Sequence, residues 1–402
     1  MKKVALFSPD AGGSVGHGFI YAHKLLQSLT KLHNVSLFTV NNPDVNNPFK
    51  ETGAELQTSS SYPIGATNKK RFNKFGRFAL IFYGFYRIKY NYDLLQQYFK
   101  MNKDKDIYHL LEFEYVATLL FFFLNPKLLK KTVLGFHSSD FEWIQGRAFS
   151  INGYKYMLHF FLKQLVQKAK YSSVHGEILK KELMRTLKIS VKCEHKIVSI
   201  PYGLNKKNKF ISKDEAISQL ALEIDSKNKI GLFFGVLRED KGLIELLEVM
   251  KNINPEVILV IAGSEGDIKI SRIIEKINEE GINHRVVHQI KYLSDYELEL
   301  YYSACDFVFV PHKKYHIAFS GPLSLAVEFH KPVVASNVGQ IGYFVNKYEI
   351  GELFDCDNYE TLADATNSLV KRLNNNNMFS FEKCVDENTW EAMAQRIEKL
   401  YS

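Results

Sequence analysis

The first half of the chain alternates short apolar runs with longer stretches of helical periodicity. The apolar runs predict strands at Lys3–Ser8, Val35–Val40, Ile107–Leu111, Thr132–Phe136, Tyr171–Val174 and Lys196–Ile200. The periodic stretches predict helices at Gly18–Leu32, 154–170 and 177–187. A glycine-rich turn separates the first strand from the first helix. This order of elements is typical of a doubly wound parallel sheet.

A polar, lysine-rich run at Asn205–Lys213 interrupts the alternation after Pro201-Tyr202-Gly203, and it predicts a linker. The alternation restarts with strands predicted at Lys229–Phe234, Glu256–Ile261, Arg285–Gln289, Phe307–Val310 and Pro332–Ala335. Helices are predicted at Gly242–Lys251, Lys269–Glu280 and Asp295–Ser303, the last with a capping box of Ser294 and Glu297. We therefore expect two Rossmann-like domains, at 1–204 and 205–385. Residues 386–402 should pack back on the first domain, with an amphipathic helix at Asn388–Leu400 anchored by Trp390.

Composition and charge narrow the classes of function. The four cysteines stand far apart without a C-x-x-C pair, which argues against a disulfide framework or a structural zinc and for a reducing compartment. No window approaches about 18 uncharged apolar residues, and the N-terminus has no segment typical of a signal peptide. We expect a cytoplasmic protein.

Residues 1–200 carry 29 Lys and Arg against 14 Asp and Glu, a net +15, whereas residues 201–402 carry a net −7. This asymmetry predicts a polyanionic partner for the first half.

The loop with Gly12 and Gly13 lies between the first strand and the first helix, where backbone N–H groups can contact a phosphate or a sugar. A dinucleotide fingerprint would place an acidic residue at the end of the second strand, but that strand ends Thr39-Val40-Asn41-Asn42. The pattern therefore excludes a dehydrogenase. A tight turn without a ligand remains the alternative.

A more specific turn follows the strand at Lys229–Phe234. Gly235 ends the strand, and Arg238 and Lys241 precede the next helix. Cations at a helix start are unfavourable against the helix dipole unless an anion compensates them. The turn therefore predicts a clamp for the two phosphates of a nucleoside diphosphate, with a solvated basic turn as the alternative.

Two further motifs follow predicted strands. Ser320 and Gly321 precede Pro322, which suits the first turn of a helix running to about Phe329, so they predict a second anion site. His137 comes directly off the strand at Thr132–Phe136, and it is a candidate for binding a sugar hydroxyl or an acceptor. A capped helix and a structural histidine are the respective alternatives. The two D-x-D sequences, Asp104–Asp106 and Asp355–Asp357, are interpreted as solvated turns, so no metal is expected.

Residues 68–92 combine aromatic and basic side chains. At 3.6 residues per turn, Phe72, Phe75, Phe78, Phe82 and Phe85 share one side, and Lys70, Lys74 and Arg77 flank it. This pattern, together with the +15 of the first half, predicts a helix lying on an anionic membrane, with an aromatic face packed on the core as the alternative. Nucleic acid is not expected, because no recognised binding module accompanies the charge.

The C-terminal half resembles family-4 retaining glycosyltransferases of the GT-B fold. The matching segments are FFGVLREDKGLIELLEVM (233–250), ILVIAGSEGD (258–267), YELELYYSACDFVFVPH (296–312), FSGPLSLAVEFHKPVVASNVG (319–339), YEIGELFD (348–355) and NTWEAMAQRIEKLY (388–401). In the first half the likeness rests on the Gly12-Gly13 loop, GFHSSD (135–140), SVHGEILKKEL (173–183) and IPYGLN (200–205).

The chain departs from the commonest family pattern at two places. Val236 stands where many members have arginine, and Ile317 and Leu325 stand where many have paired glutamates. It resembles instead a subgroup with arginine two positions later and Ser-Gly at the helix start; Glu328 lies one helical turn beyond the second glutamate position. These departures leave the donor sugar open.

The resemblance implies a two-domain GT-B fold with a cleft between the domains and a C-terminal helix crossing back to the first. It also implies a hexosyl- or N-acetylhexosaminyl-transferase that moves a sugar from a UDP- or GDP-sugar to a hydroxyl on a glycan, lipid-linked or protein acceptor, with retention and without a metal or other cofactor. Envelope polysaccharide or lipid-linked glycan synthesis at the inner face of the cell membrane is the expected setting.

The residues expected to act in catalysis are Arg238, Lys241 and His137, and those expected to bind the donor are Gly12, Gly13, Gly235, Tyr292, Ser320, Gly321, Leu323 and Glu328. The residues expected to contact the membrane or acceptor are Lys70, Phe72, Lys74, Phe75 and Arg77. A sugar-nucleotide epimerase or hydrolase of the same fold, and a non-catalytic partner subunit, are the alternatives.

Overall fold

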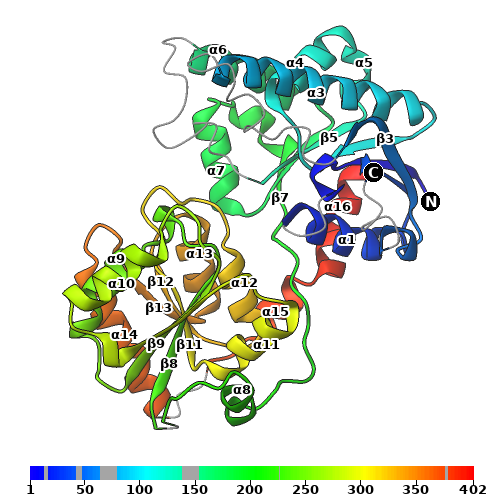
Figure 1. The fold of residues 1–402 in the computed structure, drawn as a ribbon. Coiled ribbons are helices and arrows are strands. Elements are labelled where there is room, and N and C mark those ends of the chain that lie inside the picture. The colour runs from blue at the N-terminus through cyan, green and yellow to red at the C-terminus, as the bar shows by residue number, and fades with distance from the viewer. Residues whose placement is uncertain (13–16, 42–47, 64–78, 138–153, 226, 376–378) are drawn as a thin grey trace. The chain divides into compact units, whose positions relative to one another are not determined.

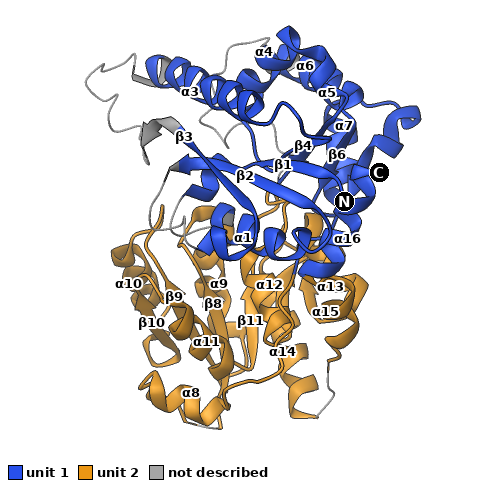
Figure 2. Cartoon of the chain, turned by 90° about the vertical axis from the view of Figure 1, so that its right-hand side faces the viewer, with its two compact units in different colours: residues 1–203, 390–402 blue, residues 204–389 orange. Residues whose placement is uncertain are grey.

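The computed structural model describes residues 1–12, 17–41, 48–63, 79–137, 154–225, 227–375 and 379–402. The chain divides into two compact units, drawn in separate colours in Figure 2. Unit 1 comprises Met1–Gly203 and Trp390–Ser402, and unit 2 comprises Leu204–Thr389. Residues 386–389, expected to begin the C-terminal helix segment, thus lie in unit 2.

Unit 1 is built on a seven-stranded parallel sheet with the strand order β3-β2-β1-β4-β5-β6-β7. The strands are β1 (Lys3–Phe7), β2 (Asn34–Asn41), β3 (Glu55–Pro63), β4 (Ile107–Leu110), β5 (Thr132–Phe136), β6 (Tyr171–Val174) and β7 (Ile197–Ser199). All except β3 were predicted from apolar runs. β3 is an edge strand that pairs only with β2 among the strands described, and its buried positions include the polar Gln57 and Ser59. Because those side chains find hydrogen-bond partners, the strand needs no apolar run.

Helices cover both faces of this sheet (Figure 1). They are α1 (His17–Leu29), α3 (Ala79–Met101), α4 (Tyr115–Leu124), α5 (Pro126–Leu129), α6 (Tyr154–Lys168), α7 (Glu177–Thr186) and α16 (Trp390–Tyr401). The last of them, α16, packs beside α1, and its Trp390, Met393 and Ile397 belong to the same buried core as β1 and β2. The predicted amphipathic C-terminal helix is therefore confirmed, and its apolar face is part of unit 1.

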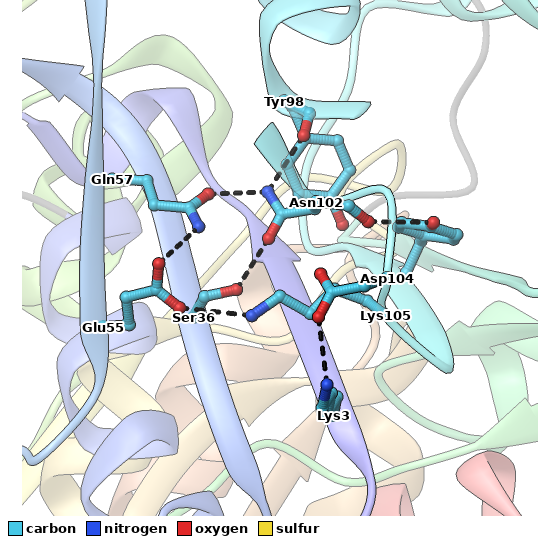
Figure 3. Close-up of polar contacts among 9 residues, drawn as sticks. Lys3, Ser36, Glu55, Gln57, Tyr98, Asn102, Asp104 and Lys105 are labelled. Carbon is cyan, nitrogen blue, oxygen red and sulfur yellow. Dashed lines mark hydrogen bonds and ion pairs between the residues drawn. The ribbon is translucent and has the colours of Figure 1, made fainter. Parts of the chain in front are cut away.

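A buried amide holds the amino ends of several unit 1 strands together (Figure 3). Asn102, at the end of α3, donates to Gln57 on β3 at 2.6 Å and accepts from Ser36 on β2 at 2.9 Å. Beside it, Lys105 pairs with Glu55 at 3.2 Å, and Lys3 pairs with Asp104 at 3.0 Å. The first D-x-D sequence thus lies in a structural turn whose carboxylate is paired with a lysine.

Unit 2 is built on a six-stranded parallel sheet with the strand order β10-β9-β8-β11-β12-β13. The strands are β8 (Lys229–Phe234), β9 (Val257–Gly263), β10 (Val286–Ile290), β11 (Phe307–Val310), β12 (Val333–Ser336) and β13 (Gly351–Phe354). Five follow the prediction within two residues at each end. β13 was not predicted as a strand, because it has only four residues and two of them, Gly351 and Glu352, are untypical of a strand.

The helices of unit 2 are α8 (Lys213–Gln219), α9 (Leu243–Val249), α10 (Ile270–Glu279), α11 (Asp295–Ala304), α12 (Gly321–Glu328), α13 (Gly339–Tyr348), α14 (Glu360–Asn374) and α15 (Glu382–Glu387). The predicted capping box of α11 is confirmed. Ser294 Oγ accepts from the Glu297 N–H at 3.2 Å, and the Glu297 carboxylate accepts from the Ser294 N–H at 2.9 Å. Apolar side chains fill both faces of the sheet, so the core runs continuously under the strand ends that carry the site.

Candidate functional site

The candidate site in unit 2 lies at the carboxyl ends of three neighbouring strands. β8, β11 and β12 are adjacent in the sheet, and each ends at a loop. The β11 and β12 loops are joined by Ser336 Oγ, which donates to the His312 carbonyl at 2.5 Å. The carboxyl edge of a parallel sheet is where ligands of α/β proteins bind.

Gly235 allows Lys241 to fold back over the end of β8. Gly235 has a φ of +114°, which favours glycine, and a Cβ at this position would lie 2.5 Å from Lys241 Nζ. The 3₁₀ turn η4 (Glu239–Lys241) brings the lysine back, and Gly242 at φ +69° then starts α9. A glycine is therefore needed at 235 both for the backbone angle and for the lysine.

Lys241 is a buried cation at the strand end. Its exposed fraction is 8%, and within the residues described no carboxylate lies at ion-pairing distance from its ammonium group. Burial lowers the pKa of Lys241 to about 8; the charge of Arg238 adds to this effect and that of Asp240 opposes it. Desolvation without a partner is unfavourable for a charge, so this position favours an incoming anion.

This burial predicts a pH-dependent cost to folding. Lys241→Met should raise the free energy of unfolding at pH 7, by up to about 3 kcal/mol, because the folded state holds the proton less tightly than the unfolded state. Between pH 8 and about 10.5 the folded wild type loses this proton first, so its stability rises with pH and the difference shrinks. Urea unfolding across this pH range, with Lys251→Met as the exposed control, checks the expectation. A difference that stays constant with pH would contradict it.

Arg238 is held by the carboxylate two residues later. Its Nε and Nη2 donate to Asp240 at 2.8 and 2.6 Å, and His316 Nδ1 lies 3.2 Å from the same carboxylate. Burial alone would raise the pKa of Asp240, but the hydrogen bonds from His316 and Arg238 outweigh it and hold that pKa well below its ordinary value. Asp240 therefore stays ionised and fixes the guanidinium, which remains about half exposed at the surface of the site.

His312 and Ser320 meet at the start of α12. His312 Nε2 lies 3.4 Å from Ser320 Oγ, and the His312 and His316 rings are 4.3 Å apart. Burial lowers the pKa of His312 well below its ordinary value, so this ring is neutral at pH 7. His312 Nδ1 and His316 Nε2 are buried and have no hydrogen-bond partner in the described part of the chain. The Ser320 side chain makes no capping bond, so an anion can accept from the first N–H groups of the helix.

The remaining predicted donor residues of unit 2 are placed differently. Gly321 begins α12, and a Cβ there would meet open space. Leu323 is fully buried in the core, so only its backbone faces the helix start. Glu328 lies at the opposite end of α12, where its carboxylate accepts from the Asn205 N–H at 2.8 Å. Tyr292 follows β10 and is 69% exposed.

His137 lies in unit 1, at the carboxyl end of β5. Its Nε2 donates to the Leu111 carbonyl at 2.9 Å, and its ring contacts those of Tyr21 and His175 at 4.8 and 4.7 Å. These contacts fix the orientation of the ring whether or not it binds a ligand.

Gly12 packs closely against β2. A Cβ there would lie 2.2 Å from Val40 Cγ2, so the turn η1 (Pro9–Gly12) requires glycine for packing alone. Gly13 lies outside the described residues. Next to this turn, Glu112 accepts from Ser8 Oγ at 2.6 Å and from the Asp10 N–H at 2.9 Å. Burial raises the pKa of Glu112 to about 7, and Asp10 adds to this effect.

Three other predictions concern metal and membrane. In the second D-x-D sequence Asp357 pairs with Lys314 at 2.9 Å, and no cluster of metal-binding side chains occurs in the described ranges. Within those ranges every helix is too short or too polar to cross a bilayer. The predicted membrane residues Lys70, Phe72, Lys74, Phe75 and Arg77 lie outside the described residues.

Asp240, His312, His316 and Glu112 were not singled out from the sequence. Each follows a strand at the carboxyl edge of a sheet, so strand-end position was the available signal. The contact between Asp240 and His316 joins the loops after β8 and β11, so no spacing pattern within one loop predicts it.

Comparison with known proteins places this geometry in a wider context. Residues 214–383 match the family model of glycosyl transferases group 1. HepE from Anabaena, in its complex with UDP, is 14% identical and has a TM-score of 0.72, with 99% of each chain covered. Sucrose-phosphate synthase from Thermosynechococcus elongatus is 20% identical with a TM-score of 0.70, covering 100% of this chain and 98% of its own. The lipopolysaccharide outer core galactosyltransferase WaaB is 14% identical with a TM-score of 0.66, covering 100% and 99%.

A search among curated proteins gave no match. The structural likenesses confirm the predicted GT-B fold, and membership of family 4 and retention remain predictions. Residues 214–383 are thus similar to glycosyl transferases group 1, in a chain with the GT-B fold.

Proposed function

We propose that this chain transfers a hexosyl or N-acetylhexosaminyl group from a UDP- or GDP-sugar to a hydroxyl acceptor, with retention at the anomeric carbon. The acceptor in this proposal belongs to an envelope polysaccharide or a lipid-linked glycan. The single observation that carries the proposal is the Lys241 ammonium, buried over Gly235 at the carboxyl end of β8.

Lys241 would stabilise the departing diphosphate. Breaking the bond between sugar and phosphate leaves negative charge on the phosphate oxygens, and a preorganised cation in a dry site stabilises that charge most strongly. Arg238 would present its exposed edge to the same group, oriented by Asp240. The start of α12, at Ser320 and Gly321, would supply N–H donors. With these charges in place the proposed reaction requires no metal ion.

The neighbours support a nucleotide-sugar donor. HepE has been solved with UDP and with UDP-glucose, and WaaB is described as a galactosyltransferase of the lipopolysaccharide outer core. The family resemblance implies that the leaving phosphate itself takes the acceptor proton, so no side-chain nucleophile is needed. His137 would orient the sugar or the acceptor. Glu328 is left out of the proposed donor site, because its carboxylate is bound by Asn205.

A nucleoside diphosphate is expected to stabilise the protein in EDTA. At about a hundred times its dissociation constant, UDP or GDP should add roughly 2.7 kcal/mol to the free energy of unfolding. Thermal unfolding with UDP, GDP and uridine measures this, because uridine lacks the phosphates that Lys241 would contact. If neither diphosphate moves the melting curve, the donor-site assignment is wrong.

Turnover then separates transfer from the alternatives. Candidate sugar nucleotides are incubated with the protein, with and without membrane extract as the source of acceptor. Transfer should release the nucleoside diphosphate only when the extract is present. Release without acceptor indicates a hydrolase, a changed sugar without release indicates an epimerase, and binding without turnover indicates a non-catalytic subunit.

A further inference from the structure

Helix α4 of unit 1 has an apolar outer face. Its sequence, YVATLLFFFL, has no charged residue. Ala117, Phe121 and Phe122 are buried against the unit, yet Phe123 is 81% exposed and Leu124 is 66% exposed. A surface helix ordinarily turns charged or polar residues outward, and contiguous exposed apolar side chains mark an interaction surface.

The apolar surface extends to the neighbouring helix. α4 packs beside α6 and α5, and the three helices lie on one face of the unit 1 sheet (Figure 1). On α6, Met157, Phe160 and Phe161 are exposed by 53%, 58% and 43%. The face formed by α4, α5 and α6 therefore presents large apolar side chains from two helices.

A basic groove adjoins the end of α4. It has a volume of about 580 Å³ and is lined by Pro126, Lys130, Gln167, Lys168, Ala169, Lys170 and Lys196. Pro126 follows Leu124 by two residues, so the groove begins where the apolar face of α4 ends. Lys196 is held in place by the carbonyls of Gln167 and Ala169, at 2.8 and 3.1 Å. Burial lowers the pKa of Lys170, and the charge of Lys2 adds to this effect.

The chain segments that form this face carry charge of one sign. Residues 115–137 and 154–176 contain seven lysines and neither aspartate nor glutamate. Lys127, Lys130 and Lys131 are exposed on α5 and just after it, and none has an ion-pair partner in the described ranges. Uncompensated lysines beside exposed aromatic side chains form a surface that is complementary to anionic headgroups over an apolar layer.

We propose that the face formed by α4, α5 and α6 docks on an anionic lipid bilayer, with Phe123, Leu124 and Phe160 in the interfacial layer and a lipid phosphate in the lysine-lined groove. A protein partner fits less well, because protein interfaces are depleted of lysine. The proposal rests on residues other than 70–77, and it does not depend on the donor site of unit 2.

Co-sedimentation of the full chain with vesicles tests the proposal. The wild type should bind phosphatidylglycerol vesicles at about 0.1 M salt, bind phosphatidylcholine vesicles much more weakly, and dissociate at about 1 M salt. Phe123→Ser with Leu124→Ser should lower the partition coefficient at least about tenfold. Lys130→Glu with Lys168→Glu should also lower the partition coefficient at least about tenfold, because each lysine near an anionic surface raises that coefficient about fivefold.

Control variants in unit 2 test whether vesicle binding depends on this surface or on the total charge and exposed apolar area of the protein. Ile274→Ser removes another exposed apolar side chain, and Lys209→Glu with Lys227→Glu makes the same charge change; neither should reduce vesicle binding. UDP binding and the circular dichroism spectrum should be unchanged in every variant.

The proposal is overturned if the α4–α5–α6 variants bind vesicles like the wild type, or if the wild type binds neither kind of vesicle. Sedimentation velocity without lipid tests the rival occupant. A dimer that dissociates in Phe123→Ser with Leu124→Ser, together with absent vesicle binding, would make this face an interface between copies of the chain and overturn membrane docking.

Discussion

Lys241→Ala is expected to lower turnover at least about a hundredfold while leaving the fold as stable as the wild type or more so. Loss of a preorganised charge at the leaving group costs about 2–4 kcal/mol of transition-state stabilisation. The same lysine is desolvated and lacks an ion-pair partner in the described part of the chain, so its removal does not weaken folding at pH 7. Rate constants from single-turnover assays, measured beside urea unfolding, give both quantities.

Two further variants sharpen this expectation. Arg238→Ala should also lower turnover, but by less if the guanidinium acts only through its exposed edge, since Asp240 already occupies Nε and Nη2. Lys251→Ala changes a lysine paired with Glu280 away from the strand ends and should leave turnover unchanged. Wild-type turnover in Lys241→Ala would show that the turn after β8 has no part in the reaction.

Trp390→Ala is expected to destabilise unit 1 by about 3–5 kcal/mol, as the removal of a buried aromatic side chain does elsewhere. Trp390 is 5% exposed, and its ring packs against those of Tyr202 and Tyr21 at 5.2 and 5.9 Å. Gly203 lies so close that a Cβ there would be 2.3 Å from the indole, so the surroundings are shaped to this ring.

Urea unfolding followed by circular dichroism checks this, since the substitution removes one of the two tryptophans on which fluorescence depends. Glu391→Ala, on the exposed side of the same helix, is the control and should change stability by less than about 0.5 kcal/mol. A loss in Trp390→Ala no larger than in Glu391→Ala would mean that α16 contributes little to the core of unit 1.

The fold was largely predictable because parallel strands buried on both faces are apolar throughout. β5, β8 and β11 have the predicted bounds, since each is a short apolar run between polar turns. β3 and β13 were not predicted, because neither is an apolar run. β3 is an edge strand that buries the polar Gln57 and Ser59, and β13 has four residues, two of which are glycine and glutamate.

From the sequence, the candidate site could be predicted only for residues whose role is visible within a single loop. Gly235, Lys241 and Ser320 were identified because each stands at a strand end or a helix start. Asp240 was overlooked, although it holds Arg238 and contacts His316, because His316 comes from a different loop. The position of Leu323 in the core and the bond between Glu328 and Asn205 likewise depend on the folded chain.

The return of α16 to unit 1 has a consequence for how the protein is made. Trp390–Tyr401 leaves the ribosome only after all of unit 2, yet it completes the core that β1, β2 and α1 begin. At about 5–20 residues per second, unit 1 waits roughly 10–40 s after Gly203 with this core incomplete. Unit 2 is continuous in sequence and can finish folding in that interval. A nascent chain stalled after Thr389, before α16 is made, should therefore be the form of this protein that chaperones bind most. In that form, unit 1 should be sensitive to protease and unit 2 resistant.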